Sequence, residues 1–423
     1  MKRRDFITQS IGTTVLAAAP TLSALSLRVN DKIEKSSNDA DNVNYDVIVL
    51  GVGSMGSAAC YHLAKQGHKV LGLEQFDIPH ELGSHAGQSR IIRKAYAEHP
   101  DYVPLLERAY QNWKTLETES GIQVYFKTGL LYFGESSNSF LKGVLTSSEK
   151  YNIQVNSLSK SVVTKKYPQF NIPNDFKCLE EPDAGFVTPE RCILLFTEQA
   201  VQLGAVIRTK EKVSEWKREN GLIKVKTNKG TFTSKKLVIT AGPWAIKMIP
   251  GYASKLKVTR QMVAWMKPKK WDLFTMDNFP CWDIEDGDYS YYGFPILPVG
   301  KFGAPLGLKL AMHYPGGEIS DPDTVNRIPN EQDEKVLINA LNKFIPEGYS
   351  ETLVMKTCMY TNSPDENFII DYLDGYDKDV AIATGFSGHG FKFASVIGEI
   401  MADLAMKGST ALPIGFLNAS RFK

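Results

Sequence analysis

The chain has 423 residues, of which 43% are hydrophobic and 23% charged, an ordinary globular composition that is long enough for two domains. Its formal net charge of +2 gives no reason to expect nucleic acid as a partner. The five cysteines form no C-x-x-C pair and the seven histidines show no ligand spacing, so we predict neither a disulfide framework nor a metal site.

The first residues resemble a targeting segment. Lys2-Arg3-Arg4-Asp5-Phe6-Ile7 is similar to a twin-arginine export motif, and a weakly apolar stretch follows it to about Leu25. We assign residues 1–29 to a signal and the polar, Ser/Asn/Asp-rich residues 30–44 to a linker, both outside the fold. This assignment predicts an exported, periplasmic protein with no stable membrane association after export. The alternative is a disordered basic tail.

Tyr45–Glu74 carries the most specific local pattern. An apolar run at 47–50 predicts a buried parallel strand, a helix follows over about 54–66, and a second strand ends at Glu74. Gly51, Gly53 and Gly56 lie between strand and helix at G-x-G-x-x-G spacing, which allows a tight turn, close approach of a pyrophosphate and close helix packing. Glu74, about 20 residues further on, is placed to hydrogen-bond a ribose hydroxyl. The pattern predicts dinucleotide binding and does not distinguish NAD from FAD.

The middle of the chain alternates between short strands and helices. A loop at 83–93 carries Arg90 and Arg93, which could hold phosphates, a flavin edge or a substrate carboxylate, or could form a surface salt-bridge pair. After the short strands of 125–188, a helix over about 189–203 marks a return to alternating strands and helices. A later apolar strand ends at Ala241 and Gly242, where the backbone could lie against a dinucleotide or simply turn.

The last third is strand-like and aromatic up to about residue 364, and then returns to the α/β pattern. Lys309 lies between Leu308 and Leu310, so its ammonium either has a role or points to solvent. A strand at 380–383 precedes glycine-rich residues 385–392 and a helix to about 407, whose N-terminus is a further anion site. We therefore predict an α/β protein with a discontinuous Rossmann-like domain at 45–124, 188–258 and 364–423, and a second, mainly antiparallel β-sheet domain at 125–187 and 259–363.

Six motifs together resemble the monomeric sarcosine oxidase and N-methyltryptophan oxidase family of FAD-dependent amine oxidoreductases. They are DVIVLGVGSMG, GSHAGQSRIIR, YYGFP, GLKL, KTCMYTNSPDENFIID and GFSGHGFKF, in order from Asp46 to Phe393. The resemblance implies FAD rather than NAD, attached covalently through the thiol of Cys358. The alternative for Cys358 is an inert cysteine on a strand.

The resemblance also implies roles for residues by position. Arg93 and Lys392 would hold the substrate carboxylate, Arg90 would lie beside the flavin ring, and Lys309 would face flavin N5 through water. Tyr96, Tyr292 and Tyr360 would shape the pocket. The residues expected to bind the cofactor are Gly51, Gly53, Ser54, Met55, Gly56, Glu74, Gln75, Arg90, Val213, Ala241, Gly242, Trp244, Cys358, Gly388, His389, Gly390 and Lys392.

The implied reaction is the oxidation of a secondary amine, such as sarcosine or N-methyltryptophan, by oxygen, giving formaldehyde, the primary amine and hydrogen peroxide. The alternatives are an oxidase of a cyclic imino acid or glycated amino acid, a non-catalytic exported flavoprotein, and an NAD-dependent dehydrogenase. Two departures from the family pattern, Ala86 in place of a second histidine and Asp283 at an apolar pocket position, affect which amine is bound. We expect a monomer whose partners are a small amine and oxygen.

Overall fold

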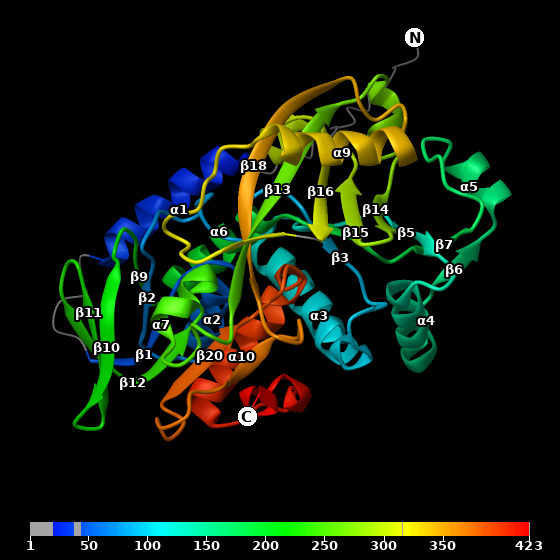
Figure 1. Ribbon diagram of the computed structural model, residues 1–423. Coiled ribbons are helices and arrows are strands. Elements are labelled where there is room, and N and C mark those ends of the chain that lie inside the picture. Colours follow the sequence, from blue (N-terminus) through cyan, green and yellow to red (C-terminus); the bar gives the residue numbers. More distant parts are fainter. Residues whose placement is uncertain (1–19, 38–43, 315, 423) are drawn as a thin grey trace, which may run out of the picture.

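Two large sheets organise the residues described by the computed structural model, 20–37, 44–314 and 316–422 (Figure 1). The first is an eight-stranded sheet covered by helices, and the second is a nine-stranded sheet built mainly from antiparallel strands. The predicted fold class is confirmed. None of the described helices is long and apolar enough to cross a membrane.

The eight-stranded sheet has the order β10-β11-β12-β1-β2-β9, with β20 beside β12 and β19 beside β20. The strands β2, β1, β12 and β20 pair in parallel, as in a Rossmann-like core. Its strands are β1 Tyr45–Leu50, β2 Val70–Leu73, β9 Val206–Arg208, β10 Val213–Glu219, β11 Leu222–Thr227, β12 Thr231–Ile239, β19 Ile369–Tyr372 and β20 Val380–Thr384.

Three helices pack together over this sheet. They are α2 Ser54–Lys65, α6 Pro189–Gln202 and α10 Ala394–Lys407. Gly398 of α10 makes the contact with α2 close, because a Cβ at that position would lie 2.4 Å from the Cβ of Ala58. The absence of a side chain at Gly398 therefore allows α10 and α2 to pack closely.

The nine-stranded sheet has the order β17-β13-β16-β15-β14-β5-β7-β6, with β18 beside β13. Apart from the parallel pair β5–β14, its strands pair in antiparallel fashion. They are β5 Leu130–Glu135, β6 Asn156–Leu158, β7 Phe176–Glu181, β13 Lys257–Lys267, β14 Cys281–Asp286, β15 Tyr289–Phe294, β16 Leu308–Tyr314, β17 Gly317–Ile319 and β18 Glu351–Asn362.

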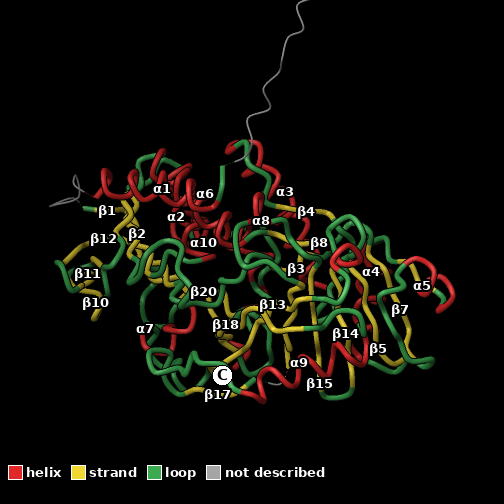
Figure 2. The backbone as a smooth tube through the Cα atoms, turned by 90° about the horizontal axis from the view of Figure 1, so that it is seen from above, coloured by secondary structure: helices red, strands yellow, loops and turns green. Residues whose placement is uncertain are grey.

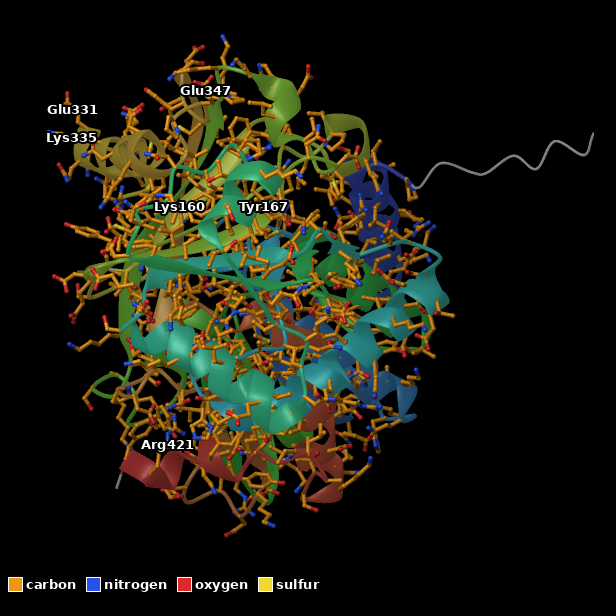
Figure 3. The ribbon with its side chains drawn as sticks, turned by 90° about the vertical axis from the view of Figure 1, so that its right-hand side faces the viewer. Lys160, Tyr167, Glu331, Lys335, Glu347 and Arg421 are labelled. Carbon is orange, nitrogen blue, oxygen red and sulfur yellow. The ribbon has the colours of Figure 1, made fainter. Side chains whose placement is uncertain are left out.

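Helix α9, Glu331–Phe344, covers the outer face of this second sheet (Figure 1). It buries Leu337, Leu341 and Phe344, while Glu331 and Lys335 project away from the protein (Figure 3). The C-terminal turn that carries Arg421 lies at the opposite end of the molecule (Figure 3). The other face of the sheet is thus left to meet the Rossmann-like part.

Smaller elements connect the two sheets. Strand β3 Arg90–Ile92 pairs with β8 Gly185–Val187, which also pairs with β4 Tyr125–Lys127. The remaining helices are α3 Val103–Ser120, α4 Ser139–Tyr151, α5 Lys160–Lys166, α7 Ala245–Met248 and α8 Val299–Phe302. Strand β3 matters most for the site, because it begins at Arg90 and is followed directly by Arg93.

The prediction for residues 22–37 is wrong. These residues form helix α1, Leu22–Ser37, which packs against α6 and β9, whereas we had expected the end of a signal and the start of a linker (Figures 1 and 2). Leu25, Val29 and Ile33 lie on one face and are at most 3% exposed. Residues 1–19 and 38–43 of the predicted signal and linker lie outside the described residues.

Helix α1 also supplies two cations to a buried carboxylate. Arg28 Nη2 and Lys32 Nζ each lie 2.6 Å from an oxygen of Glu198, whose side chain is 4% exposed. Residues 22–37 thus belong to the folded body.

Candidate active site

A large cavity is lined by residues from both sheets. Most of the predicted cofactor residues line it, namely Gly51, Gly53, Ser54, Met55, Glu74, Gln75, Arg90, Val213, Ala241, Gly242, Trp244, Gly388, His389, Gly390 and Lys392. Among the predicted catalytic residues, Arg90, Arg93, Tyr292, Tyr360 and Lys392 line it as well. Gly56, Tyr96, Lys309 and Cys358 are not part of the lining.

The glycine turn after β1 is shaped for close backbone contact. Gly51 has φ +85°, and a Cβ there would lie 2.7 Å from the carbonyl oxygen of Thr240. A Cβ on Gly56 would lie 1.8 Å from the carbonyl oxygen of Gly51, so Gly56 serves packing behind the cavity. Helix α2 begins after Gly53 without a side-chain cap, so its first N–H groups are available to an anion such as a pyrophosphate.

Glu74 lies at the end of β2 and lines the same part of the cavity. Its two oxygens accept hydrogen bonds from the backbone N–H groups of Val52 and Phe76, both at 3.0 Å. Burial raises the pKa of this carboxyl to about 7 against the effect of those donors. The carboxyl has lone pairs left for ribose hydroxyls, as the dinucleotide pattern requires.

Other buried polar atoms in the lining lack partners among the described residues. They are Nε2 of His85, the hydroxyl oxygens of Thr361 and Thr384, and Oδ1 of Asp283. Buried polar groups are ordinarily hydrogen-bonded, so these atoms fit a site that a polar ligand completes. Together with the glycine turn and Glu74, they show that the residues present fit FAD.

Arg90 is fixed by the backbone of its own loop. Its guanidinium donates to the carbonyl oxygens of Ser84, Ala86 and Ser89 at 2.6–3.0 Å. The loop is held in turn by Glu190 of α6, whose carboxylate accepts from the N–H groups of Gly87 and Gln88. Arg90 is therefore a preorganised cation at the cavity wall rather than half of a surface salt bridge.

Lys309 is 1% exposed and lies behind this wall, so the alternative that it points to solvent is wrong. Its ammonium donates to the carbonyl oxygen and the hydroxyl of Ser89, at 2.6 and 3.0 Å, and lies 4.2 Å from the centre of the Phe294 ring. Burial and then the charge of Arg90 lower its pKa well below the usual value. Its contact with Ser89 links it to the Arg90 loop.

Cys358 lies on β18 and is 4% exposed, while the next two residues, Met359 and Tyr360, line the cavity. Burial raises the pKa of its thiol, and the positive charges of Arg90 and Lys309 oppose that effect. These cations would favour the thiolate form that a covalent bond requires.

The substrate end of the cavity contains an internal ion pair. Arg93 Nη2 lies 2.9 Å from both oxygens of Glu98, and the Arg93 guanidinium lies 4.5 Å from the centre of the Tyr96 ring. Burial alone would raise the pKa of Glu98, but Arg93, followed by His389 and Lys392, holds it at about 2. Tyr96 therefore supports Arg93 from behind the cavity.

Lys392 lies at the same end. Its ammonium donates to the carbonyl oxygen of His389 at 2.8 Å, and Tyr96 Oη lies 2.6 Å from Nδ1 of that histidine. Burial and then the charge of Arg93 lower the pKa of Lys392 to about 7. Two cations thus converge where a carboxylate could bind.

Glu98 and His313 are among the lining residues that sequence reasoning missed. A signal for Glu98 is its position five residues after Arg93, within reach of an ion pair. A signal for His313 is its position on β16, where alternate residues share a face with Lys309. His313 Nδ1 lies 3.2 Å from Tyr360 Oη, so it helps to orient a predicted pocket residue.

Comparison with known proteins agrees with this geometry. The model of the family "FAD dependent oxidoreductase" matches residues 46–404. The chain is 36% identical to the monomeric sarcosine oxidase of Streptomyces avermitilis over 379 residues, which cover 89% of this chain and 97% of that protein. It is 34% identical to the N-methyl-L-tryptophan oxidase of Citrobacter koseri over 386 residues, which cover 90% of this chain and all of that protein.

Solved structures show the same fold at lower identity. NikD, an unusual amino acid oxidase essential for nikkomycin biosynthesis, matches with a TM-score of 0.77 and 22% identity, covering 89% of this chain and 97% of NikD. L-proline dehydrogenase from P. horikoshii matches with a TM-score of 0.76 and 24% identity, covering 90% and 98%. The chain therefore belongs to the FAD-dependent oxidoreductases, in the family of the monomeric sarcosine and N-methyltryptophan oxidases.

Proposed function

We propose that this protein oxidises a secondary amine, an N-methyl amino acid such as sarcosine or N-methyltryptophan, with oxygen as the acceptor. Amine, oxygen and water become the primary amine, formaldehyde and hydrogen peroxide. Bound FAD would supply the redox chemistry, and the protein would supply orientation and electrostatics. The observation that carries the proposal is that Arg93 and Lys392 lie in the same cavity as the dinucleotide-binding turn.

The carboxylate of the amino acid would be held by Arg93 and Lys392. Arg93 is already paired with Glu98, so the carboxylate would share or displace this partner, whereas the ammonium of Lys392 donates to the backbone carbonyl oxygen of His389. Tyr292 and Tyr360 line the cavity and would limit the shape of the amine that fits. Lys309 would act in the oxygen half of the reaction, where a fixed cation stabilises developing negative charge.

A peroxide-coupled assay with sarcosine, N-methyltryptophan, proline and a glycated amino acid tests this function. We expect peroxide and formaldehyde in equal amounts from the N-methyl substrates. Lys392→Met should raise KM steeply for these substrates, whereas Lys407→Met, at the exposed C-terminal end of the helix that follows Lys392, should not. Peroxide without formaldehyde from proline alone would favour a cyclic imino acid, and no peroxide from any amine would favour a non-catalytic flavoprotein.

We further propose that the cofactor is bound covalently through Cys358. The support is the position of the thiol beside two lining residues and within the fields of Arg90 and Lys309. Yellow colour that survives denaturation, together with a flavin adduct on the Cys358 peptide in mass spectrometry, is the expected result. An unmodified Cys358 in active enzyme would refute it.

We also propose that the protein is exported by the twin-arginine route. We propose separately that it is a monomer. The motif at 2–7 supports export, and the packing of α1 against α6 and β9 supports a cleavage site before Leu22. Replacing Arg3 and Arg4 by lysines should retain the precursor inside the cell. N-terminal sequencing of the exported protein locates the cleavage, and light scattering measures the oligomeric state.

A further inference from the structure

We propose that Asp283 selects substrates with a second positive charge, so that the preferred amine is an N-methyl amino acid with a cationic side chain. The proposal rests on the function above and names the substrate class of that same cavity. Asp283 lies on β14 and places a carboxyl group where the family pattern has an apolar residue.

Asp283 lies at the substrate end of the cavity. It pairs across the sheet with Tyr292 on one side and Tyr132 on the other, and both Asp283 and Tyr292 line the cavity. Its Oδ1 is buried and has no hydrogen-bond partner among the described residues. A buried acceptor without a donor costs free energy, so a donor supplied by a ligand would relieve that cost.

Asp283 has an acidic neighbour on its own strand. Asp283 and Glu285 lie two residues apart on the same face of β14, where the charge of each affects the other. Ser290 Oγ donates to Glu285 Oε1 at 2.6 Å. Burial and then the charge of Glu285 raise the pKa of Asp283. The raised pKa values of Asp283 and Glu285 favour a pair that keeps one proton and carries one negative charge.

The charges facing one another at this end favour a ligand of mixed charge. Arg93 and Lys392 provide two positive charges, whereas Glu98, Asp283 and Glu285 provide three carboxyl groups. A substrate carboxylate would take the two cations and leave Asp283 with no positive partner. A side-chain ammonium or guanidinium on the same substrate would pair with Asp283. If the carboxyl pair keeps one proton, three positive charges (Arg93, Lys392 and the substrate cation) would then face three negative ones (Glu98, the carboxyl pair and the substrate carboxylate).

The reacting amine cannot be this partner, because amine oxidation needs its nitrogen unprotonated. The cation must therefore come from a second group, and acidic side chains should be excluded by repulsion from the carboxyl pair. This assigns Asp283 a role in specificity and leaves the reaction type unchanged.

Two probes of matched length test the proposal on the holoenzyme. Nα-methyl-lysine carries a terminal ammonium, and Nα-methyl-norleucine has the same chain without the charge. We expect kcat/KM to favour the lysine derivative about tenfold or more, the scale of one hydrogen bond to a charged group. Asp283→Asn should reduce the preference to near unity, whereas Asp288→Asn, exposed in the turn of the same hairpin, should keep it.

Binding is measured in parallel by calorimetry with lysine and norleucine, which does not depend on turnover. Lysine should bind more tightly than norleucine, and Asp283→Asn should remove most of that difference. An Asp283→Asn variant that retains bound flavin and an unchanged lysine preference overturns the proposal, as does equal binding of both probes by the parent protein. If neither N-methyl probe is oxidised, the proposed function fails while the binding preference still decides the role of Asp283.

Discussion

Lys392 is the titratable side chain at the substrate end whose charge changes near neutral pH. Burial disfavours its ammonium, and the neighbouring Arg93 guanidinium disfavours it further, which together lower its pKa to about 7. Glu98 opposes this effect but is itself engaged with Arg93. A group that titrates in this range makes anion binding depend on pH.

Affinity for a carboxylate should therefore fall as pH rises through about 7. Lys392 is protonated below its pKa and attracts the anion, and above that pH it loses its charge unless the ligand restores the proton. With propionate, which has no amine to titrate, we expect the dissociation constant to be constant below pH 7 and to rise up to about tenfold per pH unit above it. Lys392→Met should bind more weakly and show no such break, and an unchanged break in this variant would assign the titration elsewhere.

In the proposed reaction, Lys309 would act in the oxygen half and not in the oxidation of the amine. Its ammonium is fixed by Ser89 in a site without exposed surface, where a charge acts more strongly than in water. Electron transfer to oxygen creates a small anion, so Lys309→Met should slow reoxidation by about 10²-fold, the scale of losing one preorganised electrostatic contact. Anaerobic reduction by the amine should persist.

Stopped-flow absorbance measures both rates for Lys309→Met. Lys267→Met is the control, because Lys267 is an exposed lysine on the adjacent strand β13. Reoxidation at the parent rate in Lys309→Met would make Lys309 a structural residue.

At the scale of secondary-structure elements, two ion pairs with the buried carboxylate of Glu198 hold helix α1 against α6. Arg28→Ala with Lys32→Ala would leave Glu198 without these cations beneath a helix whose apolar face still packs. An unpaired buried charge costs several kcal/mol at most, so we expect a loss of about 2–4 kcal/mol in the free energy of unfolding. Lys35→Ala breaks only the exposed pair with Asp31 and should cost under about 1 kcal/mol. Equal denaturation midpoints for the two variants would contradict this account.

The sequence predicted the elements whose signals are local. The strand, glycine turn and helix over 45–66 are continuous in sequence, and β1 and α2 occur as predicted. Helix α1 was missed because its buried face is marked by only three apolar residues, Leu25, Val29 and Ile33. Each is four residues from the next, and the segment around them is polar. Its main polar partner, Glu198, is distant in the chain, and sequence periodicity carries no information about such a contact.

In the site, too, the local motifs were predicted from the sequence, whereas contacts between residues distant in the chain were not. Motif positions brought most of the predicted residues to one cavity, whereas the burial of Lys309 could not be read from strand alternation. Strand β16 is covered by α9 on one side and lies against the Arg90 loop on the other, so both of its faces are buried. The pairing of Arg93 with Glu98 likewise depends on side-chain geometry that spacing suggests but does not determine.

At the scale of the whole molecule, the first sheet is assembled from three separated stretches of chain. Strands β1 and β2 come from the first, β9 to β12 from the second, and β19 and β20 from the third. Strand β20 pairs with β12, and α10 packs against α2, so the last stretch covers the dinucleotide turn. The segment with the glycine pattern, Tyr45–Glu74, therefore forms only part of the cofactor site, and the last stretch of the chain supplies another part.

A fragment that ends at residue 378 should fail to bind FAD although it contains the whole of Tyr45–Glu74. It would lack β20, α10 and the lining residues Gly388–Lys392, and would expose the apolar faces that they cover. Co-expression with residues 379–423 should restore binding, because the break falls in an exposed turn at Asp377 and Lys378. Flavin fluorescence measures this, and parent affinity in the fragment alone would contradict it.

The late position of β20 and α10 sets the timing of maturation. Translation proceeds from the N-terminus, so these two elements leave the ribosome after every other strand of the sheet. Until then, β12 has a free edge over 237–239 and α2 has an uncovered apolar face. Binding of the cofactor to the complete site, and the bond proposed at Cys358, would therefore follow synthesis, and until then these apolar surfaces are open to aggregation.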